Sequence, residues 1–116
     1  MNNYYIKAIL LDNCPYSHNA FDLIKKYQLH SKITWVSNDD KLKYKTTSIN
    51  TFPQIFLQKY NSHGSILLGG FDDIQHIYNT FYNKKYSESN ITQFMAKYNC
   101  SKKILLRLIQ LINNIN

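Results

Sequence analysis

The stretch Asp12-Asn13-Cys14-Pro15-Tyr16-Ser17-His18 joins an apolar run, Tyr4 to Leu11, to a segment with helical periodicity that begins at Pro15. The run is rich in β-formers and aliphatic residues, which predicts a buried strand. Proline suits the first turn of a helix, where its missing N–H costs nothing. Cys14 is therefore expected at a strand-to-helix junction, where the unpaired N–H groups and the dipole of the helix favour a thiolate over a thiol.

The composition indicates one folded domain. The chain has 116 residues, of which 44% are hydrophobic and 15% aromatic, and this balance is too apolar for a disordered protein. The formal charge of +7 is spread along the chain, and Arg107 is the single arginine. Bidentate arginine contacts are the usual means of reading bases, so we expect no sequence-specific nucleic-acid partner. Net charge alone can still attract nucleic acid or acidic partners weakly.

The two cysteines, Cys14 and Cys100, are too few for a disulfide-based scaffold. The first residues lack the pattern of a secretory leader. The longest apolar run, Ile104 to Ile112, is interrupted and far shorter than the roughly 20 residues that span a bilayer. We therefore expect a cytoplasmic, reducing compartment and no membrane partner.

The rest of the chain alternates predicted strands with predicted helices. We expect strands at residues 33–36, 54–58 and 65–68, the last two forming a hairpin, and helices at 15–28, 40–46, 74–81, 91–98 and 101–113. The expected helix caps are Asn38 or Asp39, Asp72 or Asp73, and a box of Asn90 with Gln93. This order predicts an α/β protein with a mixed sheet of four strands and helices on both faces.

Two further motifs carry chemical information. Thr51-Phe52-Pro53-Gln54 places a proline at the start of a strand, where it removes no hydrogen bond from the sheet. Gly69-Gly70-Phe71-Asp72 places two glycines just before a helix N-terminus, which is a favourable position for a bound carboxylate.

Together, and in this order, the three motifs resemble the glutaredoxin family, whose members have the thioredoxin fold. The resemblance covers roughly residues 4–82. It implies a three-layer sandwich, in which a four-stranded mixed sheet lies between flanking helices, with an extra C-terminal helix in this chain. We expect a glutaredoxin-like core over residues 1–86 and a C-terminal helical segment, 87–116, packed on the same domain.

The resemblance also implies roles for single residues. Cys14 matches the nucleophile that attacks a mixed disulfide between glutathione and a protein, within the catalytic motif Cys14-Pro15-Tyr16-Ser17. Pro53 matches a cis-proline that leaves the backbone of Phe52 free to pair with the cysteinyl part of glutathione. The implied glutathione-binding residues are Tyr16, Lys41, Thr51, Phe52, Pro53, Gly70, Phe71 and Asp72.

Two positions depart from the family pattern. Ser17 stands where many members have a second cysteine, so the motif cannot close an internal disulfide. Leu11 stands where the family usually has a cation, and Asp12, the nearest charge in the sequence, opposes formation of a thiolate. Lys41 or Lys43 is expected to replace part of the missing contact to a glutathione carboxylate, and a solvated lysine is the alternative.

These features favour a glutathione-dependent thiol-disulfide oxidoreductase that works by a monothiol route, with glutathione as co-substrate and glutathionylated proteins as substrates. Two alternatives stay open. Some one-cysteine members hold a glutathione-bridged iron–sulfur cluster between two subunits, although Pro15 argues against this. The fold can also serve as a non-catalytic interaction module. The sequence has no Cys/His cluster with zinc spacing, so we expect no metal.

Three features outside the motifs leave alternatives open. Cys100 is an inert, partly buried thiol, a thiol that resolves a mixed disulfide on Cys14, or one that pairs between two chains. His18 lies one helical turn after Cys14 and is expected at the surface. The last helix has a wide apolar stripe, which predicts packing on the domain, and a homodimer or partner contact is the alternative.

Overall fold

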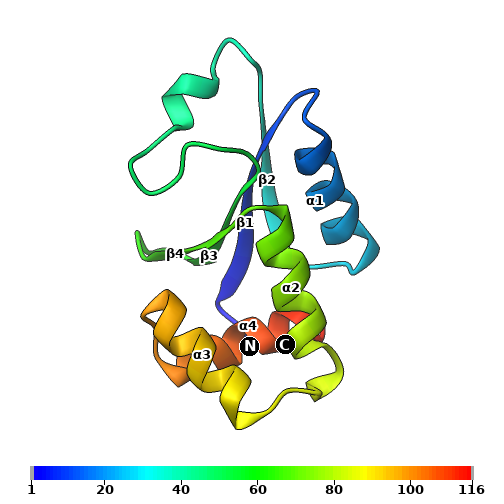
Figure 1. Cartoon of the computed structure of the whole chain (residues 1–116), viewed down its shortest axis with the longest axis vertical. Coiled ribbons are helices and arrows are strands. Elements are labelled where there is room, and N and C mark those ends of the chain that lie inside the picture. Colours follow the sequence, from blue (N-terminus) through cyan, green and yellow to red (C-terminus); the bar gives the residue numbers. More distant parts are fainter. Residues whose placement is uncertain (1, 116) are drawn as a thin grey trace.

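The structure is a computed structural model that describes residues 2–115. It is an α/β fold with one mixed sheet and flanking helices, as the sequence predicts (Figure 1). In chain order its elements are β1 (Tyr4–Leu11), α1 (Pro15–Lys26), β2 (Ser31–Val36), the 3₁₀ turn η1 (Lys41–Tyr44), β3 (Gln54–Lys59), β4 (Ser65–Gly69), α2 (Phe71–Phe81), the 3₁₀ turn η2 (Tyr82–Lys84), α3 (Glu88–Tyr98) and α4 (Lys102–Ile112).

The four strands lie in the order β2-β1-β3-β4. β1 pairs with β2 in parallel and with β3 in an antiparallel direction, and β3 and β4 form the predicted antiparallel hairpin. The C-terminal ends of β1, β2 and β4 and the start of β3 consequently lie at the same end of the sheet. The segments that follow or precede these strand ends are therefore brought together.

One face of the sheet forms the main core. Strand geometry sends alternate side chains to opposite faces, and Ile6, Ala8 and Leu10 of β1 are fully buried on the same side as Ile55 and Leu57 of β3. The helices α1 and α2 contact each other and cover this face (Figure 1). Their contribution to the core is apolar and consists of Ala20, Leu23, Ile24, Ile74, Ile77, Tyr78 and Phe81.

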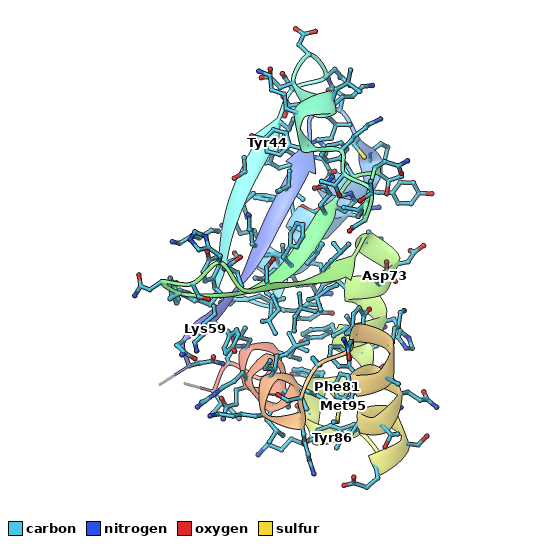
Figure 2. The ribbon with its side chains drawn as sticks, turned by 90° about the vertical axis from the view of Figure 1, so that its left-hand side faces the viewer. Tyr44, Lys59, Asp73, Phe81, Tyr86 and Met95 are labelled. Carbon is cyan, nitrogen blue, oxygen red and sulfur yellow. The ribbon has the colours of Figure 1, made fainter. Side chains whose placement is uncertain are left out.

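Fewer elements pack on the opposite face of the sheet. Among the described residues, η1 and its flanking loop lie over the end of this face near Tyr44 (Figure 2). The helix predicted at residues 40–46 is reduced to the single turn η1. Its N-cap is Asp40, so the prediction of Asn38 or Asp39 is wrong, and no side chain caps the turn. The only aliphatic residue of η1, Leu42, is 73% exposed, so the turn has no apolar side with which to pack as a longer helix.

The C-terminal helices pack on the end of the sheet opposite η1 (Figure 1). Leu105, Leu108 and Ile112 of α4 belong to the same buried cluster as Ile6 of β1. Tyr98 of α3 donates a hydrogen bond from its hydroxyl to the Leu68 carbonyl at 2.9 Å. The apolar stripe of the last helix is thus used inside the domain.

Two helix starts differ from their predicted caps. The N-cap of α2 is Gly70, and its N–H donates to the Asp73 carboxylate at 2.8 Å, so Asp73 closes the turn from the third helical position and does not cap it directly. The N-cap of α3 is Ser87, which exchanges hydrogen bonds with Asn90. Because this reciprocal pair already satisfies the first turn, the helix begins before the predicted box of Asn90 and Gln93.

Replacing a leucine of α4 tests whether the C-terminal segment is part of the cooperative core. Leu105 is fully buried, whereas its neighbour Leu106 is 40% exposed. We expect Leu105→Ala to lower the free energy of unfolding by about 2–5 kcal/mol, because it leaves a cavity in the core. The control Leu106→Ala should change it by less than about 0.5 kcal/mol. Urea denaturation measures both, and equal effects would show that α4 is not part of the core.

A second prediction concerns alkaline pH. Burial, with a smaller effect of the Asp73 charge, raises the pKa of Tyr98 to about 12, above the ordinary value of about 10 for an unfolded chain. The stability that this shift contributes is complete below about pH 10 and is lost as the pH rises toward about 12. We expect the urea midpoint to fall less between about pH 8 and pH 11 in Tyr98→Phe than in the wild type. An equal fall would contradict the assignment.

Candidate functional site

The three motifs of the sequence meet at one end of the sheet. Cys14 follows β1, Lys41 follows β2, Pro53 precedes β3 and Gly70 follows β4, and the strand directions place all of these junctions at the same end. Short distances relate the junctions at Cys14, Pro53 and Gly70. The Cys14 thiol lies 3.9 Å from the Phe52 carbonyl oxygen, and a Cβ built on Gly70 would lie 3.7 Å from the Pro53 carbonyl oxygen.

Cys14 is the N-cap of α1 and has an extended backbone conformation, with φ −105° and ψ 115°. Pro15 occupies the first helical turn, as predicted. The thiol is free and half-buried, and its one hydrogen bond within residues 2–115 is the weak one to the Phe52 carbonyl. The thiol sulfur is therefore held beside the first turn of a helix, whose unpaired N–H groups and dipole stabilise negative charge.

Ser17 and Tyr16 differ sharply in their surroundings. Ser17 is fully buried, and its hydroxyl oxygen accepts a hydrogen bond from the N–H of Leu11 at 3.0 Å. Ser17 thus fastens the end of β1 to α1 and fixes the junction that carries Cys14. Tyr16 is 60% exposed, so its ring is available to a bound molecule.

The loop before β3 forms one wall of the site. The Phe52–Pro53 peptide bond is cis, which confirms the prediction for this proline. Pro53 is buried and Thr51 is exposed. Gln54, which the motifs do not single out, is only 2% exposed and donates from its side-chain amide to the Tyr44 carbonyl at 2.9 Å. This hydrogen bond joins η1 to β3. The sequence feature that could have indicated it is a polar residue directly after the proline at the start of a strand.

The turn before α2 forms a second wall. The N–H of Gly70 donates to the Asp73 carboxylate and is therefore occupied. In the first helical turn that follows, the N–H groups of Phe71 and Asp72 have no partner within the helix, so they can bind a carboxylate. Asp72 is exposed. Lys97 of α3 lies 3.8 Å from the Asp73 carboxylate and offsets part of its negative charge.

The two lysines proposed from the sequence are not equivalent. Lys43 forms an ion pair with Asp40 at 3.0 Å, and this hydrogen-bonded contact raises the pKa of Lys43 and lowers the pKa of Asp40. Lys41 has no ion-pair partner among residues 2–115 and is only partly exposed. Of the two, Lys41 is the one whose charge remains available at this end of the sheet.

Cys100 and His18 are not part of the candidate site formed by the three motifs. Cys100 is at the α3–α4 junction, at the end of the molecule remote from the β1–α1 junction, and burial raises its pKa (Figure 1). It cannot resolve a disulfide on Cys14, because such a bond requires Cα atoms within about 7 Å. His18 is exposed, as expected, and its ring lies 4.9 Å from that of Trp35.

The described part of the chain has neither a metal-holding side-chain group nor a membrane-spanning helix. Over residues 2–115, no group of three or more His, Cys, Asp or Glu side chains is placed to hold a metal ion. None of the helices in that range is long and apolar enough to cross a membrane. Comparison of the chain with protein-family models and with curated proteins finds no match.

The glycine pair offers a test of the second wall. Gly69 has φ 124°, and a Cβ at this position would overlap the Asp73 carboxylate, whereas Gly70 has a negative φ and room for a Cβ. We expect Gly69→Ala to lower the free energy of unfolding by at least about 1 kcal/mol, because alanine is strained at positive φ. Gly70→Ala is the matched control and should change stability little. Thermal unfolding measures both, and equal stabilities would contradict this geometry.

Proposed function

We propose that the protein is a glutaredoxin-like thiol-disulfide oxidoreductase with a thioredoxin-type fold, which removes glutathione from proteins by a monothiol mechanism. The observation that carries the proposal is the free thiol of Cys14 at the N-terminus of α1, 3.9 Å from the carbonyl of the residue before a cis-proline. The unpaired N–H groups at the start of α2 lie next to this proline and suit a carboxylate.

The reaction consists of two exchanges. The Cys14 thiolate attacks the glutathione sulfur of a protein–glutathione disulfide, a new S–S bond forms to Cys14, and the protein leaves as a thiolate that takes up a proton. The thiolate of a second glutathione then attacks the glutathione sulfur held on Cys14. Oxidised glutathione leaves and the Cys14 thiolate is restored. The net change converts a protein–glutathione disulfide and one free glutathione into a protein thiol and oxidised glutathione.

The surrounding groups can hold glutathione in one orientation. The backbone of Phe52 faces the reacting sulfur and would pair with the cysteinyl residue of glutathione, next to the exposed Thr51. The N–H groups of Phe71 and Asp72 would bind the γ-glutamyl carboxylate. The charge of Lys41 would neutralise the other carboxylate, and the exposed ring of Tyr16 would cover the sulfur.

The mechanism is a monothiol cycle because the described residues place no second thiol near Cys14. Ser17 cannot form a disulfide, and its hydroxyl serves to join β1 to α1. Cys100 is at the opposite end of the molecule (Figure 1). An external thiol must therefore complete each cycle, which requires a reducing, cytoplasm-like compartment rich in glutathione.

The decisive experiment compares the two cysteines. Cys14→Ser should abolish removal of glutathione from a model peptide–glutathione disulfide, because the attacking sulfur is lost. Cys100→Ser should retain the wild-type rate, since this thiol takes no part in the cycle. The assay couples oxidised glutathione to glutathione reductase. Activity of Cys14→Ser equal to that of the wild type, or no activity of the folded wild type, would refute the proposal.

A further inference from the structure

The sheet face opposite α1 and α2 presents lysines interleaved with aromatic rings. We name it the lysine–aromatic face and define it by Tyr5, Lys7, Lys32, Phe56 and Tyr60. Lys7 is in register with Lys32 on β2 and with Phe56 on β3, so these three side chains point to the same side. Figure 2 shows this side of the sheet, with η1 and Tyr44 at one end and Lys59 toward the other end.

The lysines of this face lie against its rings. The Lys32 ammonium is 4.9 Å from the ring centre of Tyr5 and 5.1 Å from that of Tyr60, and the two rings are 4.5 Å apart. The Lys7 ammonium is 5.6 Å from the ring centre of Phe56. Lys32 is exposed and the three rings are half-buried, so both cations and rings are accessible to a ligand.

No acidic residue of the four strands balances the charges of these lysines. None of the four strands contains Asp or Glu, although they contain Lys7, Lys32 and Lys59. Over the described range, the ion pairs involve Lys43 and Lys97 and neither Lys7 nor Lys32. Within residues 2–115, Lys7 and Lys32 therefore have no carboxylate partner, and their charges are complementary to an extended anionic ligand.

The pattern distinguishes between classes of anionic partner. A second copy of the chain would bring the same lysines face to face, which like charges disfavour. A membrane surface would satisfy the lysines, but the three rings are half-buried and do not project as membrane-inserting side chains do. A single nucleic-acid strand uses both features, because its phosphates attract the ammonium groups and its unpaired bases stack on the rings.

From this complementarity we propose that the lysine–aromatic face binds single-stranded nucleic acid without sequence preference. Base-edge recognition usually relies on arginine forks, and the only arginine, Arg107, is on α4. Stacking and phosphate contacts are tolerant of sequence, so the face would bind DNA and RNA strands alike. The proposal does not depend on the chemistry of Cys14, which lies at the end of the sheet.

The test is fluorescence anisotropy with a labelled oligothymidylate of about 12 nucleotides. We expect Tyr60→Leu, which keeps an apolar side chain and removes the ring, to weaken binding about tenfold. We expect Lys32→Gln to weaken binding and to reduce the slope of log affinity against log salt by about 0.7, the value for one phosphate contact in a single strand. The matched control is Lys102→Gln, an equal loss of charge at an exposed position on α4.

The outcomes separate this site from simple charge attraction. Undiminished binding in Lys102→Gln, together with loss in Tyr60→Leu and Lys32→Gln, supports the proposal. Equal losses in Lys102→Gln and Lys32→Gln, with none in Tyr60→Leu, would show attraction by net charge alone and overturn it. Binding to vesicles of phosphatidylserine and phosphatidylcholine without binding to the oligonucleotide would overturn it in favour of a membrane. Wild-type glutathione-removal activity and urea midpoint in the variants show that they are folded.

Discussion

Backbone pairing of β1 with β2 on one side and with β3 on the other is the constraint on which the rest of the structure depends. Because one neighbour is parallel and the other antiparallel, the end of β1 lies beside the end of β2 and the start of β3. Cys14 and Phe52 are far apart in the chain and nevertheless come within 3.9 Å of each other. No local sequence preference could produce this contact, which exists only while the register Ile9 to Gln54 is kept.

The candidate site is built mostly from backbone groups and from the side chains that orient them. Ser17 accepts the N–H of Leu11, Gln54 donates to the carbonyl of Tyr44, and Asp73 accepts the N–H of Gly70. Each of these bonds fixes a segment next to the site, and over residues 2–115 none of the three side chains hydrogen-bonds to the thiol. Such a scaffold holds the candidate reactive atoms in place while the exposed Tyr16 remains free to meet a ligand.

The elements with strong periodicity were predictable, and those that depend on distant partners were not. The bounds of Tyr4–Leu11 and the start of α1 at Pro15 follow from the sequence, since apolar pattern and proline geometry decide them locally. The cap at Ser87 was missed because several polar residues compete there, and reciprocal bonding decides between them. The role of Gln54 was missed because its partner lies on another loop. The three motifs identified the candidate site, but only the sheet register shows that they meet.

The short turn η1 lies between the candidate site around Cys14 and the lysine–aromatic face. Ile9, Val36 and Gln54 are buried although they lie outside the main core, and Gln54 is joined to η1 through Tyr44, so the loop around η1 covers this end of the sheet. The segment does not continue as a full helix beyond Tyr44. The region from Lys43 to Thr51 has too few apolar residues to build such a helix. This region therefore leaves the lysine–aromatic face open, and Lys41, at the start of η1, lies at the same end of the sheet as Cys14.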